Sequence, residues 1–167
     1  MLKVILTGLL FAYSAAVAAA ASTHPLFIIE RSKNANVVHY DAQLDGNGKL
    51  DPKEPVIVYW IMLAEDGRRE ELNWLERHKA YGFSIHQDRG GQFYRMTLMA
   101  YEEREVKVFQ DGEKVRAEIA IDTRPSYLER IYIDSTEGTL IPKVNYIELF
   151  GQDVKSGEKR YEKILPK

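Results

Sequence analysis

One stretch of the chain, DAQLDGNGKLDPKEP, carries oxygen-bearing side chains at nearly the spacing of a calcium-binding loop. An EF-hand loop places its ligands at positions 1, 3, 5, 7, 9 and 12 and a glycine at position 6. With Gly48 aligned to that glycine, the residues on ligand positions 3, 5, 9 and 12 are Asp45, Asn47, Asp51 and Glu54. The first position falls on Gln43, whose neutral amide lacks the negative charge that the ion needs.

The flanks of this loop do not fit a calcium site either. An EF-hand needs a helix on each side, whereas NVVHYDA before the loop and PVIVYWI after it are rich in β-branched and aromatic residues. Pro52 and Pro55 also oppose a helix that leaves the loop. Asp-Gly and Asn-Gly pairs favour turns because they tolerate a left-handed backbone. We therefore predict a strand-to-strand connector and no metal site, with weak calcium binding by residues 45–54 as the open alternative.

No set of side chains has the spacing of a catalytic centre. The four histidines, His24, His39, His78 and His86, form no HExxH or HxH pattern, and cysteine is absent, so no zinc site is predicted. There is no Gly-x-Ser-x-Gly nucleophile elbow. We predict no catalytic residue and no cofactor. His39 and His86 are expected on the surface of strands, and His78 as a buried, hydrogen-bonded imidazole.

Polar residues inside the predicted strands are the more informative class. Glu30 and Arg31 end an apolar strand, and Arg95, Arg130 and Glu148 alternate with aromatic or aliphatic residues. They are either solvent-facing residues and structural ion pairs, because buried charges need partners, or the polar wall of a pocket. Ten tyrosines and two tryptophans fit an amphipathic ligand cleft, and they fit an ordinary β core as well.

The elements that position these side chains follow an N-terminal targeting segment. Lys3 precedes the run VILTGLLFAYSAAVAAAA, which ends in small residues as a secretory signal peptide does. Its length is near that of a membrane span, but its second half is alanine-rich and lacks a basic flank, so cleavage is favoured over an uncleaved anchor. We expect a signal peptide over residues 1–21, a periplasmic or secreted protein, and no transmembrane segment after cleavage.

Composition sets further limits on the mature chain. The formal net charge of −2 argues against a nucleic-acid surface. Without cysteine there are no disulfides, so the domain must rely on packing. Residues 22–167 are of a length that suits one β-rich domain.

Hydrophobic patterning predicts mainly short strands. Strands are expected over 25–30, 36–44, 55–63, 92–100, 104–122 as a hairpin, 127–134, 143–152 and 159–165. The hairpin turns at Asp111-Gly112, and its inward face alternates through Val115, Ala117, Ile119 and Ile121. The segment 55–63 is apolar on both faces and is expected to be a central strand covered on both sides.

One helix is expected over about 68–81, where Leu72, Trp74, Leu75, His78 and Tyr81 fall on one broad apolar arc. Gly82 supplies its C-terminal stop. The predicted fold is an antiparallel β-barrel or sandwich of about eight to ten strands with this helix packed on it.

Four motifs together resemble the exported family known as domain of unknown function 4833. They are RSKNANVVHYDA, PVIVYWIML, AYGF and YIELFGQDVKSG, and they span nearly the whole mature chain from about Pro25. The features that match the family are Arg31, Ser32, Asn34 and Asn36, then Tyr59 and Trp60, and finally Glu148 to Gly151. The resemblance implies a domain identity and no activity, and it singles out the first six of these residues with Glu148 as candidate ligand-binding residues.

Three functional hypotheses remain open at this stage. The leading one is a non-catalytic periplasmic module that binds a small molecule or an envelope protein, with Arg31, Asn34, Asn36 and Glu148 as polar contacts and Tyr59 and Trp60 as wall. The second is a hydrolase or isomerase that pairs a carboxylate with histidine or arginine. The third is a structural or assembly protein of the envelope that acts through an exposed strand edge.

Overall fold

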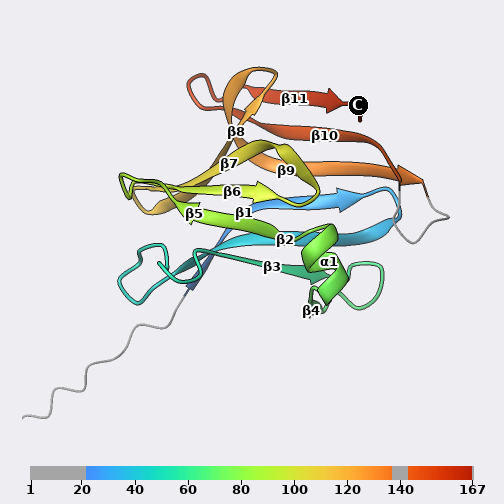
Figure 1. The fold of residues 1–167 in the computed structure, drawn as a ribbon, viewed down its shortest axis with the longest axis horizontal. Coiled ribbons are helices and arrows are strands. Elements are labelled where there is room, and N and C mark those ends of the chain that lie inside the picture. Colours follow the sequence, from blue (N-terminus) through green and yellow to red (C-terminus); the bar gives the residue numbers. More distant parts are fainter. Residues whose placement is uncertain (1–21, 137–142, 167) are drawn as a thin grey trace, which may run out of the picture.

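The computed structural model describes residues 22–136 and 143–166, which form eleven strands and one short helix (Figure 1). The predicted signal peptide, residues 1–21, lies outside the described residues. The strands are β1 (Ser22–Arg31), β2 (Asn34–Leu44), β3 (Val56–Ile61), β4 (Arg69–Glu71), β5 (Phe83–Gln87), β6 (Tyr94–Leu98), β7 (Tyr101–Asp111), β8 (Lys114–Ile121), β9 (Arg124–Thr136), β10 (Lys143–Asp153) and β11 (Lys159–Ile164), and the helix is α1 (Trp74–Lys79).

The longest strand, β9, joins two arms of one sheet. Along one edge, its residues 124–127 pair antiparallel with β8, and its residues 130–133 pair parallel with β1. Along its other edge β9 pairs with β10, which in turn pairs with β11. The first arm therefore runs β1-β2-β3-β4 and the second arm runs β8-β7-β6-β5. The two arms curl into a half-barrel (Figure 1), which confirms the predicted fold class.

The core fills the space between the two arms. In β8 the predicted inward face is buried, namely Val115, Ala117, Ile119 and Ile121. The β7–β8 hairpin turns as expected, with Asp111 opposite Lys114 and Gly112 at a φ of 63°. Tyr40 of β2 is fully buried, stacks on Phe27 and donates its hydroxyl to the carbonyl of Tyr81 at 2.5 Å. Burial raises the pKa of Tyr40, so the phenol remains a donor.

The helix is shorter than predicted, and its apolar residues do not face the core. Residues 69–71 form β4, and the helix begins only after Asn73, whose side chain accepts from the amide of Glu76 in a capping box. Leu72 is buried but precedes the helix, whereas Trp74 is 69% and Leu75 is 50% exposed. Gly82 follows the helix so closely that a Cβ there would lie 1.6 Å from the carbonyl oxygen of Arg77, so only glycine fits.

The segment 55–63 is not a central strand covered on both sides. In β3 the residues Val56, Val58 and Trp60 are buried, while Tyr59 and Ile61 on the other face are half-exposed. Beyond β3 the sheet ends with the three-residue strand β4. Ile57, Tyr59 and Ile61, the second apolar face of β3, lie on the outer surface of the first arm. Among residues 22–136 and 143–166, no helix is long and apolar enough to cross a bilayer.

Candidate functional site

The calcium-like segment is a connector between β2 and β3, as predicted. Asp45 accepts from the backbone amides of Asn47 and Lys49 at 2.8 and 3.0 Å, and Asp51 accepts from those of Lys53 and Glu54. These bonds lower the pKa of both aspartates. The carboxylates therefore act as turn formers that satisfy the loop's own amides. Within the described ranges, no group of three or more acidic or histidine side chains is placed to hold a metal ion.

Three of the seven predicted ligand-binding residues meet in one hollow, which we call the Trp60 pocket. Its volume is about 170 Å³, and it is lined by Arg31, Asn36, Trp60, Met62, Glu70, Glu71, Asn73 and Glu76. The guanidinium of Arg31 lies 4.6 Å from the centre of a Trp60 ring, and the indole N–H donates to Glu76 Oε2 at 3.2 Å. β1, β3 and the first turn of α1 thus supply one wall each.

The polar groups of the Trp60 pocket are largely bound by neighbouring residues outside it. Asn36 Oδ1 accepts from the amide of Ala64 at 2.8 Å, Glu70 binds Arg68, and Glu71 lies 3.3 Å from Arg69. A volume of this size holds a few water molecules and falls below the 300–1,000 Å³ of typical ligand pockets. The polar contacts of the Trp60 pocket therefore mainly connect α1 to β3, and the pocket is a poor candidate for a ligand site.

Ser32 and Asn34 lie at the β1–β2 turn and are used by the backbone there. The Ser32 hydroxyl accepts from the amide of Ser135 at 3.2 Å, which extends the contact between β1 and β9. Asn34 Oδ1 accepts from the amide of Asn36 at 3.1 Å and from the Arg31 guanidinium at 3.3 Å. Both side chains hold the turn together.

Tyr59 and Glu148 point to the opposite side of the sheet from Trp60. Successive residues of a strand face opposite ways, so Tyr59 lies outward where Trp60 lies inward. The register places Tyr59 beside His39, His39 beside Ile28, Ile28 beside Arg130, Arg130 beside Phe150, and Phe150 beside Tyr161. We call these six residues, one from each of β3, β2, β1, β9, β10 and β11, the outer row.

A second line of outward residues runs next to the outer row, with Glu30, Tyr132, Glu148 and Lys163 in register. Glu148 accepts from the Tyr161 hydroxyl at 2.8 Å and lies 3.8 Å from Lys163. The bond to Glu148 raises the pKa of Tyr161. The predicted ligand residues therefore do not share one concave site. They divide between the Trp60 pocket, the β1–β2 turn, the outer row with Tyr59 and the line beside it with Glu148.

Cations lie against the rings of this outer surface. Arg69 is 3.8 Å from the ring centre of Tyr59, Arg130 is 3.7 Å from that of Phe150, and the Lys163 amine is 3.3 Å from that of Tyr146. Tyr59 also stacks on His39 and donates to Asp41 at 2.6 Å. Burial and that bond raise the pKa of Tyr59 to about 12.

The charged strand residues form ion pairs, which was one of the two interpretations left open. Arg130 binds Glu30 at 2.7 Å and Arg95 binds Glu105 at 2.8 Å. At one end of the outer row, Arg130, Phe150, Tyr161 and Lys159 line a hollow of about 400 Å³. The surface is thus made of paired charges and braced rings, with a shallow depression beside β11.

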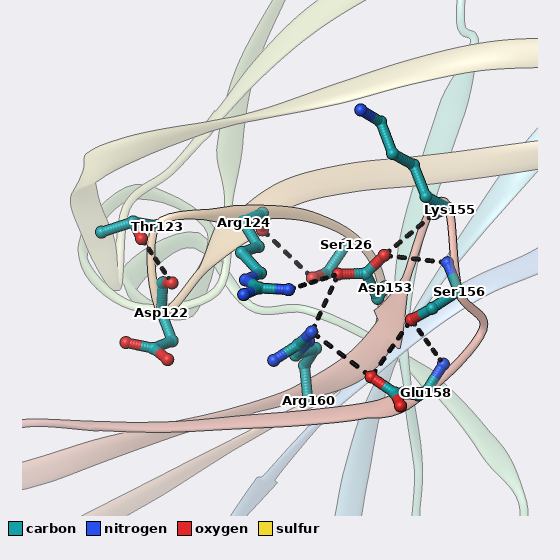
Figure 2. Close-up of polar contacts among 9 residues, drawn as sticks. All are labelled: Asp122, Thr123, Arg124, Ser126, Asp153, Lys155, Ser156, Glu158 and Arg160. Carbon is teal, nitrogen blue, oxygen red and sulfur yellow. Dashed lines mark hydrogen bonds and ion pairs between the residues drawn. The ribbon is translucent and has the colours of Figure 1, made fainter.

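A corner that the sequence did not single out lies at the β10–β11 turn (Figure 2). Asp153 is 8% exposed, accepts from the amides of Lys155 and Ser156, and binds Arg160 at 3.1 Å. Ser156 and Lys159 have the Ser-x-x-Lys spacing, but they lie on a hairpin and no helical turn brings them together. The Ser156 hydroxyl donates to Glu158 at 3.3 Å, so these polar side chains are bound within the turn. Beside them lies an open hollow of about 590 Å³.

The histidines are dispersed. His78 was expected to be buried but is exposed, because α1 turns its apolar arc outward; its Nδ1 lies 2.8 Å from the carbonyl oxygen of Trp74 and its ring stacks on the Trp74 indole. His86 on β5 is exposed as expected, and His39 is half-buried in the outer row. None of these rings is hydrogen-bonded to a carboxylate among the described residues.

A curled β half-barrel with paired charges on its outer face defines the structural class. The sequence model of one family, described as domain of unknown function DUF4833, matches residues 27–163. The chain belongs to this family, as its motifs indicated. The same comparisons find no matching curated protein and no matching solved structure.

Proposed function

We propose that this protein is a non-catalytic binding module of the periplasm or the secreted fraction, and that it binds a protein partner through the outer row. The observation that carries the proposal is the unbroken register of Tyr59, His39, Ile28, Arg130, Phe150 and Tyr161 across six strands. Tyrosine and arginine are the residues enriched where protein interfaces bind most strongly.

The dimensions of the outer row suit a protein. Strands lie about 4.8 Å apart, so six strands span about 24 Å. With the four-residue second line beside it, about 7 Å further along the strands, the surface covers about 300 Å². It would form the centre of the roughly 800 Å² that one partner contributes to a stable interface. The hollow beside Arg130 and Tyr161 would receive a projecting side chain of the partner.

A protein partner fits the rings better than a glycan does. Sugar recognition uses the open face of an aromatic ring, but a cation already lies against Tyr59, Phe150 and Tyr146. Those rings are left with their edges for a partner, which suit edge contacts with the side chains of a polypeptide.

The enzymatic alternative receives less support from the geometry. It needs a carboxylate paired with arginine or histidine in a cleft. The most buried such pair among the described residues is Asp153 with Arg160, whose side chains are 10% and 19% exposed. The Asp153 carboxylate also accepts from the amides of Lys155 and Ser156, so it holds a turn and is poorly suited to proton transfer.

Affinity purification from an envelope extract of the source cells tests the proposal. The wild type is compared with a double variant, Tyr161→Ala with Lys163→Ala, at the exposed end of the surface. The matched control is Phe109→Ala with Lys107→Ala on the second arm, which also removes one ring and one lysine; the Lys107 amine lies 5.0 Å from the Phe109 ring centre. We expect a specific protein that the wild type and the control retain and that the double variant retains at least about tenfold less. Equal retention by all three would contradict the proposal.

A further inference from the structure

Helix α1 carries an apolar surface that the rest of the described chain leaves exposed. Trp74 is 69% exposed and Leu75 is 50% exposed, and they are adjacent in the first turn. Leu72, just before them, is by contrast 6% exposed. The chain instead presents an indole and a leucine side by side to the solvent.

The charges on the exposed side of α1 are positive. Arg77, His78 and Lys79 occupy the last turn and are exposed, while Glu76, the one acidic residue of the helix, turns inward to the Trp60 indole and the Asn73 amide. Glu71 lies 3.6 Å from Arg77. No ion pair involves Lys79 within residues 22–136 and 143–166, so the helix keeps a free cation beside its apolar pair.

Local contacts hold Trp74 in this outward position. Its ring stacks on His78 at 4.7 Å with an interplanar angle of 24°. The capping box fixes the first turn, and the bond from the Trp60 indole to Glu76 ties the helix to β3. The exposed indole is therefore presented by a braced element, so little conformational entropy is lost when it binds.

We propose that α1 is a peripheral docking site for an anionic lipid surface. Tryptophan favours the headgroup region of a bilayer, where its ring is buried and its N–H stays hydrated. Lysine and arginine beside it are attracted to anionic headgroups. A helix of six residues is about 9 Å long, too short for a typical protein interface, whereas a bilayer needs only a few inserted side chains. The docking is weak and reversible, because two apolar side chains make a small anchor.

The test uses the protein purified from a periplasmic fraction and two kinds of vesicles, one of pure phosphatidylcholine and one with equal parts of phosphatidylcholine and phosphatidylglycerol. We expect co-sedimentation with the anionic vesicles and a blue shift of tryptophan emission. Trp60 is 4% exposed, so it serves as an internal reference, and the shift reports Trp74. The variants Trp74→Ala with Leu75→Ser and, separately, Lys79→Glu should each reduce binding at least about tenfold.

Leu165→Ser is the matched control, since Leu165 is 68% exposed but lies directly after β11, outside α1. It should bind as the wild type does. The proposal is overturned if the wild type binds neither vesicle, if Leu165→Ser loses binding equally, or if both α1 variants bind normally. A dimer detected by light scattering, with Trp74 buried at its interface, would also overturn the proposal.

Discussion

At the scale of single residues, the β8–β9 turn has an unusual backbone. Asp122 and Thr123 both have positive φ, at 49° and 64°. A two-residue hairpin turn of this kind normally takes Asn-Gly, because a β-branched residue is strained there. The turn is held by Glu162, which accepts from the amide of Asp122 at 2.6 Å. The strain is thus balanced by a contact from β11.

Replacement of Thr123 by glycine should relieve that strain. We expect Thr123→Gly to raise the free energy of unfolding by about 0.5–1 kcal/mol. The left-handed conformation costs a residue with a side chain about 1–2 kcal/mol, and part of this gain is offset because glycine loses more conformational entropy on folding. Chemical denaturation measures the change. The control, Gly112→Thr in the β7–β8 turn at a φ of 63°, should change stability in the opposite direction. A destabilised Thr123→Gly would show that the turn is not strained.

At the scale of elements, a charged clasp joins β7, β11 and the β8–β9 turn. Arg104 donates to both carboxylate oxygens of Glu162 at 2.6 Å, with the two side chains 29% and 21% exposed. These bonds lower the pKa of Glu162 below its ordinary value. Because the folded pKa is the lower one, the clasp stabilises the fold above the unfolded pKa of about 4.3 and loses this contribution as the pH falls further.

The variant Glu162→Gln should reveal the clasp through its pH dependence. At pH 7 we expect it to lower the free energy of unfolding by about 1–3 kcal/mol, the range for charged hydrogen bonds. Below the unfolded pKa of about 4.3 the difference from the wild type should shrink. It should disappear once the pH falls below the lowered folded pKa, where the folded wild-type carboxylate is protonated too. Denaturant titrations at pH 7 and at lower pH measure both values. A difference that stays constant with pH would assign the effect to packing instead.

Local elements could be predicted from the sequence, and long-range pairings could not. The β7–β8 hairpin followed from Asp111-Gly112 and from alternation in β8, both of which are local signals. The predicted helix was too long because residues 69–71 pair with β3 as β4, a contact that local periodicity does not encode. Its burial was wrong because Trp74 and Leu75 have the spacing of a core-facing arc but face outward. The parallel β1–β9 pair joins residues 28–31 to 130–133, and no local pattern encodes such a contact.

The candidate site could likewise be predicted only in its local features. Tyr59 and Trp60 were predicted to form the wall of one site, yet the two-residue period of a strand puts them on opposite faces. Ion pairing of Arg95 was predictable as one of two options, whereas the partnership of Arg130 with Glu30 depends on the β1–β9 register. The outer row could not be assembled from the sequence, because it needs the order of six strands.

At the scale of the whole molecule, the half-barrel buries one face of its sheet and presents the outer row on the other face, across β3, β2, β1, β9, β10 and β11.

The proposed export belongs to this scale as well. The predicted cleavage after residue 21 should leave a mature chain that begins at Ser22, the first residue of β1. Intact-mass measurement of the protein from a periplasmic fraction would show this, and a full-length mass would contradict it.

Site-directed photo-crosslinking in living source cells tests the binding face most directly. A photoreactive phenylalanine analogue is placed at Tyr161 in the outer row and, as the matched site, at Phe109 on the second arm. We expect a discrete crosslinked protein from the Tyr161 position and none from the Phe109 position. Crosslinks of equal yield at both positions, or only at Phe109, would contradict the claim that the outer row is the binding face.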